Sequence, residues 1–395
     1  MISIKDKKKC CGCSACVQRC PKQCINFRED NEGFRYPYID TDKCINCGLC
    51  EKVCPIINQY NEKVPTKVYA AINTNEKIRM QSSSGGIFTY IATKVIEEKG
   101  VVFGARFDKN WEVKHDFTEN IEGLSAFRGS KYMQSRIEDN YLKVEKFLKD
   151  GRKVLFSGTP CQIAGLKRYL KKNYENLLTI DIICHGVPSP KIWRLYLNEI
   201  YKKNLISHNI QENTGNKSHI TDINFRDKSS GWKTYSFTLT LNNPNLPNRN
   251  IKYQETFTDN IFMKGFLNNL YLRPSCHDCA FKSGKSNSDI TLADFWGINI
   301  LSPKLDDNKG TGLIICNNDK LLDLFSLKTT FDYSEVIKYN ISAIKSSIEH
   351  KNRTRFFKQI ECCNSISKLI QEKIEFSIID KIKIIIRKIK SIIKI

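Results

Sequence analysis

The sequence predicts an α/β fold class, α+β overall, in which a small cysteine-rich domain precedes a larger α/β domain with a partly parallel sheet and an inserted antiparallel ribbon. Two observations predict it: a duplicated cysteine pattern near the N-terminus, and alternating strand and helix patterns further along. A length of 395 residues suits more than one core. We expect domains at 1–62 and 66–350, the latter with sub-parts at about 66–150 and 151–350, and a basic amphipathic helix at 366–395.

The composition predicts a cytoplasmic, metal-binding protein. The chain has 17 cysteines, and its first residues, MISIKDKKKC, lack the apolar segment of a secretory signal peptide. In a reducing cytosol, clustered cysteines favour metal over disulfides. The formal net charge of +21 would suit nucleic acid, but no basic and aromatic nucleic-acid motif is present. We therefore expect no nucleic-acid partner.

The first element is a repeat of C-x2-C-x2-C-x3-C-P, whose two copies are offset by 34 residues. Three close cysteines can bind three corners of one [4Fe–4S] cubane while the fourth reaches the other cluster; zinc knuckles, the alternative, gain nothing from the third cysteine. The repeat resembles a bacterial two-cluster ferredoxin-like domain. Cys11 and Cys24 are surplus and predicted to be small buried residues. The predicted ligands are Cys10, Cys13, Cys16 and Cys54 for cluster 1, and Cys44, Cys47, Cys50 and Cys20 for cluster 2.

The larger domain opens with a strand at 68–72 and a helix at about 87–98, followed by the strand VVFGARF. The turn SSSGG, residues 82–86, lies at the N-terminus of this helix, where backbone N–H groups and hydroxyls suit a phosphate. Ordinary helix capping explains the same residues equally well. Both interpretations stay open at this point.

Strand and helix alternate again, with strands at 153–156 and 177–183 and helices from Pro160 and from about residue 190. Such alternation predicts parallel strands whose carboxyl ends share one edge of the sheet. Cys161 and Cys184 come directly after two of these strand ends, and we expect them to face the same crevice. Cys161 also begins a helix, whose dipole favours the thiolate.

The segments YSFTLTL and IKYQETF alternate with period two around an Asn/Pro loop and predict the inserted antiparallel ribbon. A C-x2-C pair follows, ahead of a strand that ends at Asp294. His185 is a candidate catalytic proton donor or ligand-orienting group, the alternative being a hydrogen-bonded structural histidine. Zinc and a redox-active dithiol are the alternatives to a third [4Fe–4S] cluster, which the spacing predicts on Cys161, Cys184, Cys276 and Cys279.

The C-terminal segment FSIIDKIKIIIRKIKSIIKI combines an isoleucine stripe with lysine and arginine at helical spacing. Its frequent charges exclude a membrane-spanning helix. The pattern predicts association with a membrane surface through 371–395, peripheral on the inner face of the cell membrane. Docking on a partner or on the protein's own core is the alternative.

Six further motifs occur in order: SSSGG, FRGSKYMQS, FSGTPCQIAGL, CHGVPSP, RPSCHDC and ITLADFWG. Across residues 66–350 they resemble the family of coenzyme F420 hydrogenase/dehydrogenase beta subunits. The resemblance implies an iron–sulfur flavoprotein that uses FAD, with coenzyme F420 as a cofactor of some relatives, and it includes the four cysteines of the predicted third cluster. It implies contacts to flavin or substrate phosphates at Ser83, Ser84, Gly85, Gly86, Ser130 and Lys131.

We therefore expect an iron–sulfur, flavin-dependent oxidoreductase, a class whose relatives include enzymes encoded beside surface-polysaccharide genes. Electrons would pass between an external ferredoxin or redox partner protein, the [4Fe–4S] clusters and, through FAD, a small-molecule substrate that accepts two electrons. The alternative is an electron-transfer subunit of a larger complex with no substrate of its own.

Overall fold

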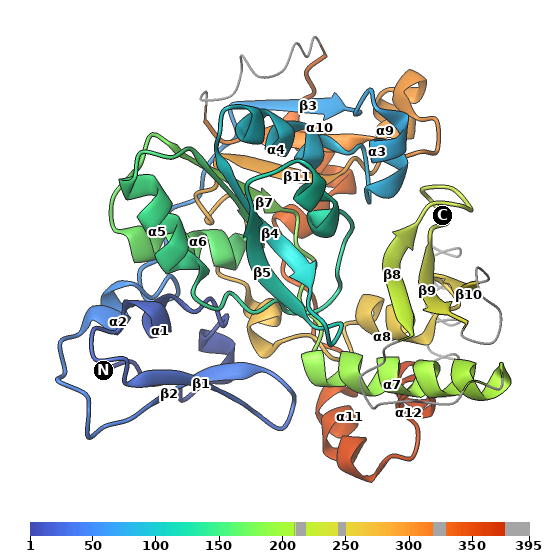
Figure 1. Ribbon diagram of the computed structural model, residues 1–395, viewed down its shortest axis with the longest axis horizontal. Coiled ribbons are helices and arrows are strands. Elements are labelled where there is room, and N and C mark those ends of the chain that lie inside the picture. Colours follow the sequence, from blue (N-terminus) through green and yellow to red (C-terminus); the bar gives the residue numbers. More distant parts are fainter. Residues whose placement is uncertain (209, 211–218, 244–249, 319–328, 376–395) are drawn as a thin grey trace, which may run out of the picture.

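The computed structural model describes residues 1–208, 210, 219–243, 250–318 and 329–375. Within them the chain forms a small N-terminal unit, a central seven-stranded sheet with helices on both faces, and a separate three-stranded sheet (Figure 1). The predicted α/β class, with a partly parallel sheet and an antiparallel insertion, is confirmed.

The N-terminal unit, residues 1–62, contains two copies of one short motif. In each copy a helix begins directly after a residue in the left-handed conformation, Ser14 with φ 73° and Gly48 with φ 71°. These positions are equivalent in the two cysteine runs, so the duplication extends to the backbone. An antiparallel ribbon separates the copies. The elements are α1 (Ala15–Arg19), β1 (Ile25–Glu29), β2 (Arg35–Ile39) and α2 (Leu49–Lys52).

The central sheet has the strand order β3-β12-β11-β7-β6-β4-β5. The pairs β11–β7, β7–β6 and β6–β4 are parallel, and the pairs toward both edges are antiparallel. The parallel centre is the strand–helix–strand unit that the sequence predicts. Its strands are β3 (Lys67–Ala71), β4 (Val101–Phe107), β5 (Val113–Thr118), β6 (Val154–Gly158), β7 (Leu177–Ile182), β11 (Ile290–Asp294) and β12 (Gly312–Cys316).

Helices cover both faces of this sheet because its strands present apolar side chains to each face in turn. Val102 of β4 and Leu155 of β6 share a core with Ile91 of α4. Their neighbours Phe103 and Phe156 join the core of α5 and α6 on the opposite face. The helices of this region are α3 (Glu76–Gln81), α4 (Ile87–Glu97), α5 (Asn140–Lys149) and α6 (Pro160–Leu170).

The inserted sheet packs against α7 and α8 at the right of Figure 1. Its core is aromatic, since Trp193 of α7 contacts Phe225, Phe237 and Phe262. The predicted ribbon corresponds to β9 and β10, and a third strand, β8, pairs with β9. The elements are α7 (Pro190–Ser207), β8 (Ile220–Asp227), β9 (Ser236–Asn242), β10 (Asn250–Thr256) and α8 (Ile261–Leu267).

The C-terminal helices return to the inserted sheet. Leu369 and Ile370 of α12 are buried in the core that α7 and α8 form, so this part of the predicted C-terminal helix docks on the protein itself. The remainder, 376–395, with its predicted membrane contact, lies outside the described residues. Of the described helices, none is long and apolar enough to cross a membrane. The helices of this region are α11 (Arg353–Gln359) and α12 (Ile366–Ile374), whereas α9 (Ile298–Leu301) and α10 (Tyr333–Tyr339) pack with β3 and β12 of the central sheet.

The turn between β1 and β2 holds the N-terminal unit against the larger domain. Gly33 in this turn has φ +87°, and a Cβ on it would come within 2.3 Å of the Lys191 Cβ on α7. Glu32 accepts a hydrogen bond from Arg353 Nη1 at 3.1 Å. A residue larger than glycine at position 33 would therefore separate the two domains.

Candidate metal centre

The inner set of thiols, Cys10, Cys13, Cys16 and Cys54, lies where the N-terminal unit meets the larger domain. A Cβ placed on Gly165 of α6 would come within 3.0 Å of the Cys13 Sγ. Burial raises the pKa of Cys16 well above the ordinary thiol range, and the neighbouring Cys10 and Cys54 raise it further. Cys13, Cys16 and Cys54 are buried and Cys10 is half-buried, and the set is in contact with the central domain.

The outer set, Cys20, Cys44, Cys47 and Cys50, faces away from that junction. All four line one small hollow whose walls are residues of the N-terminal unit alone. Cys47 is exposed, and the Ile2 N–H donates to the Cys50 Sγ at 3.4 Å. Cys24 is buried beside this set, with its Sγ 3.3 Å from the Cys20 Sγ.

The fourth cysteine of each run lies with the opposite run. Cys54 accompanies Cys10 and Cys16, and Cys20 lines the cavity of Cys44 and Cys50. A crossed pair of clusters needs this grouping. The ligand assignment itself stays a prediction.

The third set, Cys161, Cys184, Cys276 and Cys279, converges from three parts of the larger domain. Cys161 is in the first turn of α6, Cys184 follows β7, and the other two belong to the turn around Pro274–Asp278. Burial raises the pKa of Cys184 far above its usual value, and Cys276, Cys161 and Cys279 raise it further. Burial also raises the pKa of Cys276, to about 12. Among the described residues, no group of three or more His, Cys, Asp or Glu side chains could hold a single metal ion. This is true of the third set and of both N-terminal sets.

Cys11 links the inner and third sets. Its buried thiol is within hydrogen-bonding reach of both Cys13 and Cys161. The hydrogen bond with Cys11 and burial raise the pKa of Cys161 and so oppose the effect expected of the helix dipole, which stays a prediction. The sequence predicts Cys11 to be surplus because it lies outside the cysteine repeat. A residue that lies between two ligand sets in space need not follow the spacing of either set.

The turn at residues 82–86 is largely satisfied by its own neighbours. The Ser84 hydroxyl donates to Thr311 O at 2.8 Å, and the Ser83 Oγ lies 2.9 Å from the Ser130 Oγ. Gly85 lies against backbone, since a Cβ there would come within 2.4 Å of Ala71 O. Close packing therefore explains Gly85 without any ligand. Gly86 is the N-cap residue of α4 and has φ +78°, which explains a glycine at that position.

Two cations lie beside this turn. Burial lowers the pKa of Lys131 to about 7, and its ammonium donates to Arg128 O and Gly129 O at 2.9 and 3.1 Å. Arg226 of β8, which the sequence reasoning missed, is 4% exposed and pairs with Asp294 at 3.1 Å. Its Nε has no hydrogen-bond partner among the described residues. The turn therefore has a buried and unpartnered N–H beside it, since the Arg226 Nη2 lies 3.5 Å from Ser83 O.

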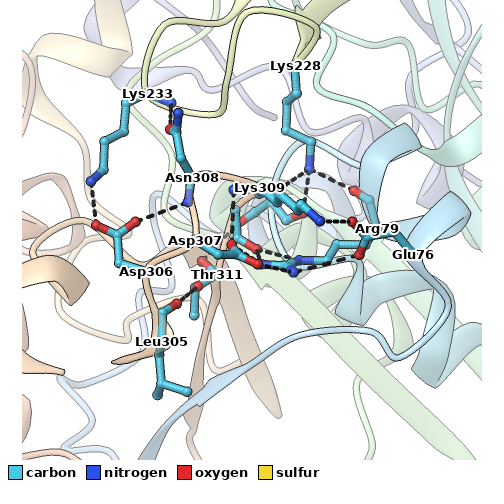
Figure 2. A network of polar contacts seen from close by, with 12 residues as sticks. Glu76, Arg79, Lys228, Lys233, Leu305, Asp306, Asp307, Asn308, Lys309 and Thr311 are labelled. Atoms are coloured by element: carbon cyan, nitrogen blue, oxygen red, sulfur yellow. Dashed lines mark hydrogen bonds and ion pairs between the residues drawn. The ribbon is translucent and has the colours of Figure 1, made fainter. Parts of the chain in front are cut away.

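The loop of residues 305–311 is held over the same turn by a polar network (Figure 2). Arg79 of α3 makes two hydrogen bonds with the Asp307 carboxylate, at 2.7 and 2.6 Å, and one from Nε to Gly310 O at 3.0 Å. Lys228 donates to Lys309 O at 2.7 Å and to Ser84 O at 3.0 Å. Burial, and then the charge of Arg79, lower the pKa of Lys228 to about 8.

Arg79→Met should lower the free energy of unfolding by about 2 kcal/mol, because it leaves the Gly310 carbonyl without its donor and releases the loop. Lys309→Met is the matched control: its ion pair with Glu76 in the same network is half-exposed and should contribute no more than about 1 kcal/mol. Urea unfolding followed by circular dichroism measures both. Equal losses in the two variants would show that the buried guanidinium does not hold the loop.

His185 follows Cys184, but its ring is held by structural contacts. Its Nε2 lies 2.6 Å from the Asn269 Oδ1, and its ring meets Phe266 edge-on at 5.3 Å between centroids. Burial lowers the pKa of His185. These contacts fit the structural alternative; a catalytic role stays a prediction.

A duplicated cysteine unit against an α/β domain with a further cysteine set defines an iron–sulfur electron-transfer protein. The family model described as a 4Fe-4S dicluster domain matches residues 9–56. The models of the N-terminal and C-terminal parts of the coenzyme F420 hydrogenase/dehydrogenase beta subunit match residues 68–139 and 151–340. The chain belongs to this family of beta subunits, and the predicted resemblance is confirmed.

Individual relatives match parts of the chain. One of the subunits of the F(420)H(2) dehydrogenase of Methanosarcina mazei is 26% identical over 213 residues, covering 50% of this chain and 59% of the relative. A ferredoxin of Mycolicibacterium smegmatis is 36% identical over 87 residues, 21% of this chain and 71% of its own. A chain of the F420-reducing [NiFe] hydrogenase complex from Methanosarcina barkeri is similar with a TM-score of 0.44 and 17% identity, covering 80% of this chain and 90% of that one. The chain thus spans little more than half the length of the larger curated relative, 59%.

Proposed function

We propose that this chain is an iron–sulfur, flavin-dependent oxidoreductase that passes electrons between ferredoxin-type [4Fe–4S] clusters and a two-electron acceptor. The convergence of the third set beside the inner set carries the proposal, because a ferredoxin-like carrier alone has no use for four further half-buried cysteines gathered in one place. Each set supplies four cysteines, the number that a [4Fe–4S] cluster binds. The donor sets therefore fit the groups that they are proposed to hold.

The positions of the sets support an order among them. The outer set opens at the surface of the N-terminal unit, next to Ile45, which is 59% exposed. The inner set touches α6 and, through Cys11, the third set. An external ferredoxin or similar redox partner would dock at the outer set, and electrons would reach the larger domain by way of the inner set.

FAD would join one-electron carriers to a two-electron reaction. Ser83, Ser130, Lys131 and Arg226 gather donors at the N-terminus of α4, and the unpartnered Nε of Arg226 suits a phosphate oxygen. Coenzyme F420 is named for the dehydrogenase relative of Methanosarcina mazei and for a sulfite reductase of Methanocaldococcus jannaschii that is 29% identical over 195 residues. These names support F420 as a second candidate for the two-electron partner.

Anaerobically purified full-length protein should contain about twelve irons, about twelve acid-labile sulfides and about one flavin per chain. Colorimetric iron and sulfide assays and the absorbance of the released flavin measure these quantities. About eight irons without flavin would refute the third cluster and the enzyme. The protein would then be reduced to a two-cluster carrier.

An electron-transfer subunit without its own substrate is the second candidate function. It is favoured by the dehydrogenase relative, whose name describes one component of a larger enzyme. Turnover of a small-molecule acceptor by the isolated chain would exclude it. A cytoplasmic location, contact with the inner face of the membrane and a link to surface-polysaccharide biosynthesis stay predictions of the sequence.

A further inference from the structure

Arg273 is a buried cation among neutral partners. It is 1% exposed. Its Nε donates to Cys10 O at 2.9 Å, its Nη1 to Gln134 Oε1 at 2.9 Å and its Nη2 to Arg35 O at 3.1 Å. Within the described part of the chain no carboxylate lies within ion-pair distance of this guanidinium. A buried charge without a counter-charge is costly, so a compensating negative group is expected nearby.

The negative groups at hand are the cysteines. The Arg273 Nη2 lies 3.7 Å from the Cys10 Sγ, within hydrogen-bonding distance for sulfur. Cys11 and Cys276 also interact electrostatically with the guanidinium. Arg273 therefore stands between the inner set and the third set, at the junction that electrons would have to cross.

The backbone at Gly12 packs closely against the Arg273 guanidinium. Gly12 has φ +71°, and a Cβ on it would come within 3.0 Å of the Arg273 Nη1 and 2.7 Å of the Gln134 Nε2. The Tyr36 and Phe34 rings lie 4.3 and 5.5 Å from the guanidinium carbon and exclude water from it. The outer set has no equivalent buried cation among the described residues: the Met1 ammonium, which interacts with Cys50 and Cys44, and Lys22 both line its cavity but are exposed and therefore screened by water.

We propose that Arg273 is a positioning residue that raises the reduction potential of the cluster held by the inner set and so makes that cluster the exit from the N-terminal unit. The inference rests on the proposed function, since it assumes the clusters. When a thiolate-bound cluster takes up one electron, its negative charge grows by one, and a buried cation with an N–H aimed at a ligand sulfur stabilises that reduced form. The electron comes from a reduced external ferredoxin, and no proton need move.

The test is a redox titration of the full-length protein followed by electron paramagnetic resonance. Arg273→Gln should lower the potential of the inner cluster most, lower that of the third cluster by less, because Arg273 also acts on Cys276 and Cys161, and leave the outer cluster unchanged. Arg273→Lys keeps the charge on a shorter side chain and should shift the inner cluster by less. If the glutamine variant loses iron, the lysine variant carries the test.

Arg353→Gln is the matched control. Arg353 is also buried, at 5% exposed, and its Nε and Nη2 donate to the carbonyl of Leu272, directly before Arg273, at 3.0 and 2.9 Å. It pairs with the Glu32 carboxylate, however, and its hydrogen bonds within the described residues go to that carboxylate and to the Leu272 carbonyl rather than to a cysteine. The variant should loosen the same junction without moving any potential.

The outcomes distinguish the role of Arg273 from the proposed function. Unchanged potentials in an Arg273 variant that retains full iron would overturn the role of Arg273 and leave the proposed function standing. An equal shift in the Arg353 variant would overturn it too, because the effect would then come from loosened packing. Wild-type protein with fewer than three clusters would instead refute the proposed function.

Discussion

Replacing Cys276 by alanine should remove about four of about twelve irons per chain and stop electron transfer beyond the N-terminal unit. Cys276 is one of four thiols that meet at the carboxyl edge of β6 and β7, and the Val187 N–H already donates to its sulfur at 3.4 Å. The variant leaves three of the four thiolates that a [4Fe–4S] cluster binds, which weakens its retention. Iron analysis measures the loss of iron. Electron paramagnetic resonance of the dithionite-reduced protein at low temperature measures the loss of the cluster signal.

The control for Cys276→Ala is a cysteine that is buried but belongs to none of the sets. Cys316 of β12 is 1% exposed in the core of the central sheet. Cys316→Ala should keep all the iron. If both variants lose the same amount, disturbed packing rather than lost ligation is responsible, and Cys276 is refuted as a ligand.

Cys20→Ala should abolish the cluster of the outer set although Cys20 belongs to the first cysteine run. Its sulfur lines the cavity of Cys44, Cys47 and Cys50, whereas Cys13 of the same run lies against α6. About four irons should be lost, and the resonance that disappears should be the one that Arg273→Gln does not shift. Reduction by an external ferredoxin should be lost with it, because the surface-exposed entry is gone.

Cys24→Ala is the control for that experiment, because the Cys24 Sγ lies only 3.3 Å from the Cys20 Sγ in the same buried surroundings. It is not a predicted ligand and should keep its iron. Loss of the inner cluster in Cys20→Ala would mean that the two runs do not exchange ligands. Loss of iron in Cys24→Ala alone would show that Cys24, not Cys20, is the ligand.

Local pattern was enough to predict the parallel centre of the sheet. The strand–helix–strand spacing around Pro160 predicts a right-handed connection between two parallel strands. Because β6 and β7 are parallel, their carboxyl ends, and hence Cys161 and Cys184, lie at one edge of the sheet. Strand β8 was missed because its pairing with β9 is interrupted by two register shifts, which break the alternation of apolar residues. The position of β12 between β3 and β11 depends on long-range pairing, of which a local pattern carries no trace.

The site was predictable where ligands recur at fixed spacing and unpredictable where single residues meet across the chain. Arg273 bonds to Cys10 from 263 residues away, and nothing in either neighbourhood specifies that contact. Its position three residues before Cys276 was the available signal. Arg226 lies in the missed strand, so its approach to Ser83 was hidden with it.

Strand β3 emerges first among the strands of the central sheet during synthesis, but it is among the last to find its partner. Ala71 pairs with Gly312, so the ribosome must add roughly 240 residues before this ladder can form. The N-terminal unit needs only its own residues for both of its thiol sets. Both of its thiol sets can therefore be complete while the rest of the chain is still being made, whereas the third set is completed only after Cys279 has emerged. The three thiol sets are therefore completed in the order in which translation supplies their cysteines.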